Sequence, residues 1–364
     1  MTGLDIPHLR LHNQRIAQHD LRTPAEVVAH LAAVQAQDYA GGKWAVGLRL
    51  PNATVDDIEQ AIADRTIVRT WPMRRTLHFV AAVDIRWMLA LTASRAKAKF
   101  TGRQRQLELD SEAFRHSGNV LEKALSGGKS LSRQTLYRLF EEAGIRMEGG
   151  GPLDSGNVRG LHILAHHAQT GLICYGPHQG KQPAFVLLDE WVPNSPLLDR
   201  DEALAELAKR YFTSHGPATV YDFAWWSGLA VRDATAGIEM ASRHLVKEVI
   251  DARTYWLPPS GIGVNEPSSP VHILPPFDEY TVAYKDRSAV VAPEHAGLAS
   301  SGGVFRPIIV VDGRVVGTWK ANARKAAIVV TRTPFGNLSR AQEHSFSEAA
   351  RRYADFLGMP LSVE

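Results

Sequence analysis

The chain has 364 residues, of which 45% are hydrophobic and 22% charged, and its formal net charge is +3. These values are typical of a folded soluble protein of two or three domains and exclude a disordered chain, while the lack of a long apolar run excludes a membrane-spanning helix. The single cysteine, Cys174, excludes an intramolecular disulfide and a cysteine-rich zinc site. The N-terminal residues do not follow the pattern of a signal peptide, so we expect a cytoplasmic protein.

Charge is unevenly distributed along the chain. Residues 1–140 carry 20 basic and 13 acidic residues (+7), residues 141–270 carry 10 and 16 (−6), and residues 271–364 carry 11 and 9 (+2). Of the 41 basic residues 30 are arginine, whose planar guanidinium suits phosphates and base edges. A basic N-terminal part suits a polyanionic partner, but a GC-rich genome would also favour arginine over lysine, so composition leaves both explanations open.

The first predicted helix lies in "TPAEVVAHLAAVQAQ", residues 23–37. Thr23 is in the N-cap position, Pro24 is at the first helical position, and Glu26 completes a capping box. A second helix is predicted over 54–64, and two short β-rich segments follow within 66–81. The order is therefore helix, turn, helix and a two-stranded wing.

The same order of elements recurs twice more. The second copy begins at Ser132 as N-cap, turns at Gly144, and continues with a helix over 157–171 and strands within 172–188. The third begins at Thr219 as N-cap and turns at Gly228. Its second helix is predicted over 232–245 and its strands over 246–259. Helix, turn, helix and wing is the winged-helix plan, and three copies in one chain predict three such units.

The last hundred residues follow another pattern. "FRPIIVVDGRVVGTWK", residues 305–320, predicts a β-hairpin around Asp312-Gly313, and 325–333 predicts one further strand. An amphipathic helix over 339–358 closes the chain. The predicted fold class is therefore α+β and mainly α, with three tandem winged helix-turn-helix units and a small β-rich C-terminal extension. We place the units at 1–110, 111–195 and 196–364.

Two glutamines stand where the first predicted helix gives way to a turn, in "VQAQD" at 34–38. On a regular helix Gln35 and Gln37 would point about 200° apart and could not share one face. Glutamines at a helix end usually cap carbonyl groups or face solvent. The local sequence alone therefore leaves their role open.

Five segments together resemble one protein family. They are "VQAQD", "RTWPMRRTLHFV" (69–80), "LLDEWVP" (187–193), "LPPFDEYTVAYKDR" (274–287) and "GGVFRPIIVVDGRVVGTW" (302–319). They are similar to the winged-helix DNA glycosylases of the AlkZ/YcaQ kind, and Gln35-Ala36-Gln37 matches the Gln-Φ-Gln branch, in which Φ is apolar. The resemblance covers nearly the whole chain.

The resemblance implies a fold, an activity and site residues. It implies a C-shaped, basic channel for duplex DNA, release of N7-alkylated purines, unhooking of interstrand crosslinks, and catalysis by Gln35 and Gln37. It also implies a β-hairpin in the DNA minor groove, for which we select the region 270–300 with His272, Pro275 and Lys285. The implied partner is double-stranded DNA with alkylated or crosslinked purines, and the implied location is the nucleoid.

Two neutral amides suit this chemistry. A purine alkylated at N7 is already cationic, so it leaves as a neutral base without a proton donor, and the enzyme has to position a water and stabilise a sugar with oxocarbenium character. An amide can accept a hydrogen bond and donate one at the same time, and it cannot ionise. Asp38 is the adjacent carboxylate and a second candidate for base or electrostatic stabiliser. No lysine stands near the motif as a Schiff-base nucleophile, which predicts a monofunctional enzyme.

Basic residues near the motif are candidates for DNA contacts. Such spaced charges are usually a solvated surface, and here phosphate contact is an equal alternative. With the hairpin residues above, the candidates are Arg69, Arg74, Arg75, His78, Lys97, Lys99 and Arg103.

Several alternatives remain at the level of sequence. His162 and His166 have the i,i+4 spacing of a metal motif, but without an intervening Glu or a third ligand we expect packing or phosphate contact, no metal and no cofactor. Trp71, Trp225 and Trp226 are predicted to lie in the core.

A non-enzymatic winged-helix regulator and an inactive relative of the enzyme are the rival functions. Regulators of this class are usually single-winged dimers, so three units in one chain favour a monomer.

Overall fold

The computed structural model describes residues 4–74, 76–148, 158–180, 182–261, 271–324 and 327–363, without the side chains of 93–101, 261 and 363. The chain forms two compact units. The N–C unit combines Met1–Gln60 with Leu204–Glu364, and the middle unit is Ala61–Ala203. The boundaries predicted at 110 and 195 do not coincide with those of these units.

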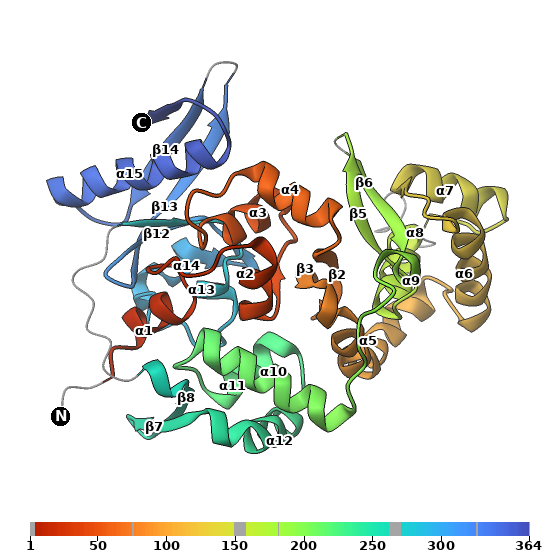
Figure 1. Ribbon diagram of the computed structural model, residues 1–364, viewed down its shortest axis with the longest axis horizontal. Helices are drawn as coiled ribbons and strands as arrows, with labels where there is room; N and C mark the ends of the chain where they lie inside the picture. The colour runs from red at the N-terminus through yellow and green to blue at the C-terminus, as the bar shows by residue number, and fades with distance from the viewer. Residues whose placement is uncertain are drawn as a thin grey trace. The chain divides into compact units, whose positions relative to one another are not determined.

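The N-terminal part of the N–C unit is mostly helical (Figure 1). Thr23 and Glu26 form the predicted capping box of α2, and Pro24 is its first residue. Its elements are α1 (Ile6–Asn13), α2 (Pro24–Leu31), β1 (Val34–Gln35), α3 (Tyr39–Gly47) and α4 (Val55–Ala63), which continues into the middle unit.

The expectation that the first helix runs on to Gln37 is wrong. Helix α2 ends at Leu31 because Ala32 takes a positive φ of 63°, outside the helical region. Gln35 consequently lies in the short strand β1. An extended segment, unlike a helix, can present residues two apart to the same side.

The third predicted helix-turn-helix has the expected elements. Thr219 and Asp222 form a capping box, and Gly228 ends the first helix with a φ of 74°. Trp226 is fully buried as expected, but Trp225 is 43% exposed and donates its indole N–H to Val282 O, so its assignment to the core is wrong. The elements are α10 (Arg200–His215), α11 (Val220–Ser227), α12 (Val231–Ala241), η2 (Ser242–His244), β7 (Val246–Ile250), β8 (Arg253–Leu257) and η3 (Pro259–Gly261).

A five-stranded sheet completes the N–C unit in the order β15-β14-β13-β12-β9. Asp312 and Gly313 have φ values of 47° and 70°, which is the geometry of the predicted two-residue hairpin turn. Only β14 and β15 pair in parallel. The strands are β9 (His272–Leu274), β12 (Ile308–Val311), β13 (Arg314–Ala323), β14 (Ile328–Pro334) and β15 (Leu361–Val363).

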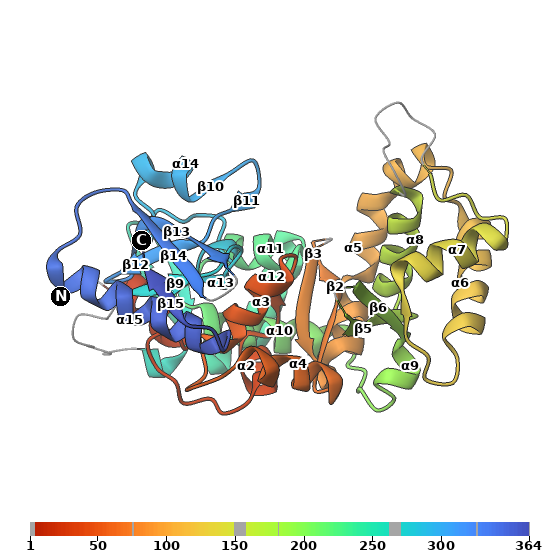
Figure 2. The same cartoon turned by 90° about the horizontal axis from the view of Figure 1, so that it is seen from above.

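Short helices and one long helix flank this sheet. Ser339 caps the closing helix α15 (Arg340–Phe356), as its sequence indicates. Figures 1 and 2 show α14 and α15 on opposite sides of β12 and β13. The remaining elements are α13 (Glu279–Val282), η4 (Pro293–His295), α14 (Ala296–Ala299), β10 (Ser300–Ser301) and β11 (Val304–Phe305).

The middle unit contains the first two predicted wings. Its strands form an antiparallel arrangement in the order β3-β2-β5-β6-β4, in which Arg69 of β2 pairs with Tyr175 of β5. The two wings thus share one sheet, which is why no boundary falls at residue 110. The elements are β2 (Ile67–Met73), β3 (Thr76–Ala81), η1 (Ala82–Asp84), α5 (Ile85–Gln106), α6 (Ser111–Leu125), β4 (Leu131–Ser132), α7 (Arg133–Glu142), α8 (Val158–Gln169), β5 (Ile173–Gln179), β6 (Gln182–Leu187) and α9 (Leu188–Trp191).

Two histidines of α8, His166 and His167, pack inside this unit. His167 Nε2 lies 2.8 Å from Ser117 Oγ, and burial lowers the pKa of His167 to about 3. The His166 ring stacks on Phe114 at 3.6 Å between centroids. Trp71 lies in the same apolar core as Phe140 and Phe185, as predicted. Within the described ranges no group of three or more His, Cys, Asp or Glu side chains is arranged to hold a metal ion.

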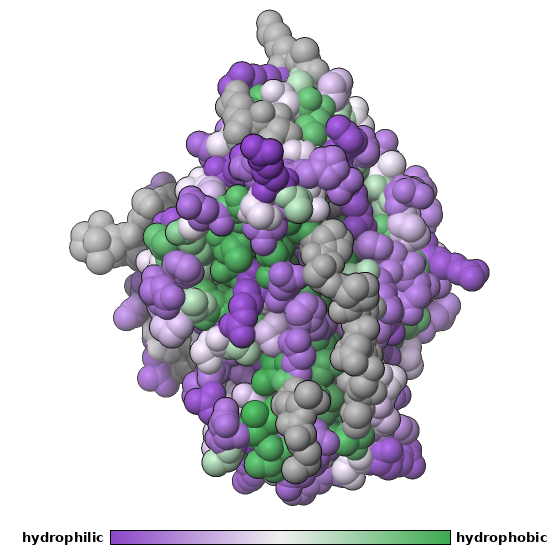
Figure 3. Space-filling view, turned by 90° about the vertical axis from the view of Figure 1, so that its left-hand side faces the viewer, coloured by the Kyte–Doolittle hydropathy of each residue, from purple (hydrophilic) through white to green (hydrophobic). Residues whose placement is uncertain are grey.

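Polar residues dominate the face of the protein in Figure 3, with smaller apolar areas between them. No helix in the described part of the chain is both long and apolar enough to span a bilayer.

Candidate active site

Gln35 is held by its backbone and leaves its side-chain carbonyl unpaired. The residue is only 5% exposed, and its backbone N–H donates to Glu279 Oε1 at 2.9 Å. The side-chain oxygen Oε1 is buried and has no hydrogen-bond partner among the residues that the structure describes. A buried acceptor without a partner costs about 1–3 kcal/mol, so this atom is suited to receive a hydrogen bond from a water or ligand.

Glu279 connects Gln35 to an aromatic cluster. The carboxylate is fully buried, and its Oε2 accepts the indole N–H of Trp226 at 2.8 Å. His215 Nε2 lies 3.5 Å from the same oxygen, and the His215 ring stacks on Tyr211 at 4.8 Å. Burial lowers the pKa of His215, which favours its neutral form at neutral pH.

Asp278, the residue before Glu279, holds the start of α13 in place. Asp278 forms a bidentate ion pair with Arg49, with both N–O distances 2.9 Å and both side chains fully buried. Arg49 also donates to Gln14 and Ala45, so every N–H group of its guanidinium has a partner. Asp278 accepts from Tyr280 N as the N-cap of α13. Asp278 and Glu279 thus connect α13 to two residues of the N-terminal part of the unit, Arg49 and Gln35.

Gln37 and Asp38 lie on the surface next to this buried network. Both side chains are exposed. Asp38 is the N-cap of α3 and accepts the backbone N–H of Gly41 at 2.8 Å. A Cβ at Gly41 would lie 3.1 Å from Pro276 Cγ, which explains glycine at this close approach. The motif therefore combines a buried amide with an exposed amide and an exposed, helix-capping carboxylate.

Two of the predicted DNA-contacting residues are buried. Arg69 is 7% exposed, and its guanidinium lies over the Tyr175 ring at 4.9 Å. His78 is fully buried, with Nδ1 2.9 Å from the backbone oxygen of Thr76. Phosphate contact requires exposed cationic atoms, and both of these predicted DNA contacts are buried in this structure.

The other basic candidates differ in accessibility. Arg74 and Arg103 are half-buried, and Arg103 donates to Gln106 Oε1 at 3.1 Å. Lys285 is exposed, with Nζ 5.5 Å from the centre of the Tyr221 ring. Arg75 and the side chains of Lys97 and Lys99 lie outside the described residues.

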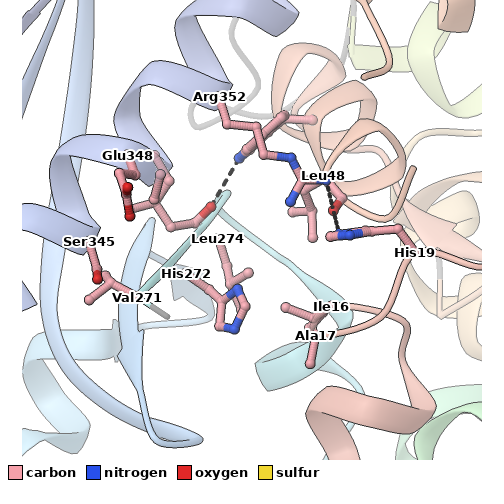
Figure 4. Close-up of a pocket in the computed structure, with 13 residues that line it drawn as sticks. Ile16, Ala17, His19, Leu48, Val271, His272, Leu274, Ser345, Glu348 and Arg352 are labelled. Atoms are coloured by element: carbon pink, nitrogen blue, oxygen red, sulfur yellow. Dashed lines mark hydrogen bonds between the residues drawn. The ribbon is translucent and has the colours of Figure 1, made fainter. Parts of the chain in front are cut away.

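His272 lines a cavity of about 200 Å³ between β9 and α15 (Figure 4). His19 and Arg352 line the same cavity, and both donate to the Leu48 carbonyl oxygen. Burial and the nearby Arg352 lower the pKa of His272 to about 4. The side chain is therefore neutral at pH 7, and its predicted contact with DNA stays a prediction.

The region selected for a minor-groove hairpin contains none. Residues 271–300 form β9, α13, η4 and α14, and Pro275 lies in the loop after β9. A short hairpin follows immediately, where β10 and β11 pair across Gly302 and Gly303, both with positive φ. Phe305 of this hairpin packs on Phe277 at 5.8 Å between ring centroids.

Comparison with known proteins identifies the family. The model of the family described as DNA glycosylase AlkZ-like matches residues 28–356. The chain belongs to this family. A relative from Streptomyces sahachiroi, named an interstrand DNA cross-link repair glycosylase, is 25% identical over 373 residues, which cover 96% of this chain and 95% of the relative. The structure of the S. sahachiroi DNA glycosylase AlkZ matches all of both chains with a TM-score of 0.80 and 23% identity.

Membership in the AlkZ-like family makes the protein a hydrolytic DNA glycosylase, so its substrate is DNA. The structural match supports the α+β fold class. The family assignment also decides against the non-enzymatic regulator as the rival function.

Sequence reasoning did not find the residues that hold the AlkZ-like motif in place. Arg49, His215, Asp278 and Glu279 were not among the predicted site residues. Two adjacent acidic residues inside the apolar stretch 271–284 were a usable signal, because buried carboxylates need partners. The sequence could not identify those partners, which lie more than 200 residues away.

Proposed function

We propose that this enzyme hydrolyses the N-glycosidic bond of N7-alkylated purines in duplex DNA and unhooks interstrand crosslinks made by such adducts. The observation that carries the proposal is the buried, unpaired Oε1 of Gln35 within the Gln-Ala-Gln motif. The S. sahachiroi relative, named an interstrand DNA cross-link repair glycosylase, supports crosslinked DNA as a substrate.

The proposed mechanism needs no acid. The C1′–N9 bond breaks and the cationic base leaves as a neutral group. The water whose hydrogen bond Gln35 Oε1 accepts forms the new C1′–O bond, and its proton passes to solvent. Gln37, two residues further on and exposed, contacts the same water or the sugar from the DNA side. Asp38 is a second candidate for stabilising the oxocarbenium character of the sugar. Because an amide does not ionise, the site acts only on leaving groups that are already activated.

The test is base release under single-turnover conditions from a duplex with one N7-methylguanine, read as alkali-sensitive nicking. We expect release from this duplex and none from the same duplex with unmodified guanine. Below the pKa of the N1–H group of N7-methylguanine, where the base is cationic, the rate should be nearly constant, since neither glutamine titrates, after subtraction of spontaneous depurination. Equal release of unmodified guanine, or a rate that depends on pH within that range, would contradict the unassisted departure of a cationic base.

We further propose that the three helix–helix–hairpin segments act as tandem winged-helix units of a monomer that binds duplex DNA. Among the basic candidates whose side chains are described, Lys285 is exposed and Arg103 is half-buried, whereas two guanidinium nitrogens of Arg74 are buried. Arg75, Lys97 and Lys99 remain candidates from sequence.

Duplex affinity should fall steeply with salt. Each neutralised phosphate contributes a slope of about −0.9 to the dependence of log affinity on log salt concentration. Fluorescence anisotropy with a labelled duplex at several salt concentrations measures the slope. We expect Lys285→Ala to make the slope less negative by about one unit, whereas Lys209→Ala, which removes a lysine paired with Glu206, should leave it unchanged. A flat dependence in the wild type would reject an electrostatic DNA-binding surface.

A further inference from the structure

We propose that Glu279 is a positioning residue for Gln35: it fixes the backbone of the Gln-Ala-Gln motif so that the Gln35 amide is held in place for catalysis. This inference rests on the proposed function of Gln35. It adds a residue that acts through the main chain of another residue.

The first argument is the direct contact. Gln35 follows the end of α2 and lies in a two-residue strand, where a helix no longer fixes its backbone. Its N–H donates to Glu279 Oε1 at 2.9 Å across 244 residues of sequence. A carboxylate acceptor makes this hydrogen bond stronger than one to a neutral group. The bond therefore fixes the peptide group that leads directly to the Gln35 side chain.

The second argument is that Glu279 cannot move easily. It is fully buried, and its other oxygen accepts the Trp226 indole N–H at 2.8 Å. Trp226 is also fully buried and packs on Tyr211 at 5.0 Å between ring centroids. Asp278 holds the start of the same helix through the buried pair with Arg49. The acceptor for the Gln35 N–H is thus fixed by Trp226 through its other oxygen and by the Asp278–Arg49 pair through the helix.

The third argument is the choice of residue. A buried carboxylate is unfavourable unless it is well paired, and an apolar residue of similar size would pack in its place at lower cost. Glu279 has two oxygens that accept from two different N–H donors, one on the motif and one in the core. A neutral amide has only one oxygen and cannot accept from both donors with equal geometry. The carboxylate is therefore suited to join the motif to the core.

The main test is Glu279→Gln, with Glu279→Asp as a second variant that keeps the charge and withdraws it from the Gln35 N–H. We expect the single-turnover rate of base release from N7-methylguanine DNA to fall about tenfold to a hundredfold, because small displacements of a positioning group cost this much. The Kd for the same duplex should change less than twofold. If Glu279→Gln does not fold, Glu279→Asp carries the test.

The matched control is Tyr280→Phe, the next residue of the same helix. It removes a buried hydroxyl that donates to Gly313 O at 2.6 Å and leaves the Gln35 contact intact. Its rate should stay within twofold of the wild type after correction for the folded fraction. An equal loss of rate in Tyr280→Phe and Glu279→Gln would reduce the role of Glu279 to general stability and overturn the inference.

A double-mutant cycle separates this inference from the proposed function. If Glu279 acts through Gln35, the loss of rate from Glu279→Gln should shrink in the Gln35→Ala background, while its effect on unfolding stays the same. Independent, multiplicative losses of rate would overturn the positioning role. An unchanged rate of base release in Gln35→Ala would instead reject the proposed function. A reduced rate in Gln35→Ala together with the full wild-type rate in both Glu279 variants would reject the inference alone.

Discussion

Replacing Gln35 with alanine is expected to lower the single-turnover rate of base release about a hundredfold or more while the Kd for the damaged duplex stays within about twofold. Removing one group that stabilises a transition state typically costs this much. The buried Oε1 of Gln35 has no hydrogen-bond partner among the described residues, so its loss removes the proposed contact to water or substrate without breaking a hydrogen bond of this oxygen within the fold. Gln37→Ala should lower the rate in the same way from the exposed side.

The matched control for this experiment is Gln60→Ala, an exposed glutamine at the end of α4. It should leave both the rate and the Kd unchanged. Circular dichroism and thermal unfolding of the three variants show whether each one folds. Base release at the wild-type rate in both Gln35→Ala and Gln37→Ala would remove the glutamine pair from the mechanism and leave Asp38 as the candidate to test next.

Arg49→Ala should cause the largest loss of stability that we expect from a single substitution in the N–C unit. Truncation leaves the Asp278 carboxylate buried without its cation, and breaking a buried ion pair in this way typically costs about 3–5 kcal/mol. The backbone oxygens of Gln14 and Ala45 and the side-chain oxygen of Gln14 lose donors as well. Urea unfolding followed by tryptophan fluorescence measures the free energy of unfolding.

Arg332→Ala is the matched comparison in the same unit. Arg332 pairs with Glu343 at 2.8 Å, but both side chains are partly exposed, and such pairs contribute at most about 1 kcal/mol. Arg49→Ala should also reduce base release by more than the folded fraction explains, because Asp278 is the N-cap of the helix that carries Glu279. A stability loss no larger than that of Arg332→Ala would show that the buried pair does not hold α13.

Local signals in the sequence were sufficient for most elements of the fold. The capping box at Thr23, the N-caps at Ser132 and Thr219, and the Asp312-Gly313 turn all have the predicted geometry. Each of these signals acts over a few residues, so a single sequence contains it completely. The end of α2 is different, because Ala32 has no glycine-like preference for a positive φ, and only tertiary packing selects that conformation there.

The site could be predicted only in part for the same reason. The glutamine motif is contiguous and was found, whereas its anchor depends on a contact between residues 35 and 279. The burial of Arg69 depends on the pairing of the first wing with the second at Tyr175. An isolated strand pattern cannot show which face a neighbouring hairpin will cover.

The long stretch of sequence between Gln35 and its anchor Glu279 determines when the site can form during synthesis of the enzyme. Residues 61–203 form a unit inserted into the N–C unit, and the partner of the Gln35 backbone lies 244 residues further along the chain. The middle unit can fold on the ribosome before the segment that follows it exists. The glutamine motif is therefore made well before its anchor, and it acquires that anchor only after Glu279 has been translated. A nascent chain that ends before Glu279 would present the motif without its support, and competence to cut glycosidic bonds would arise only after the later segment of the N–C unit has been made.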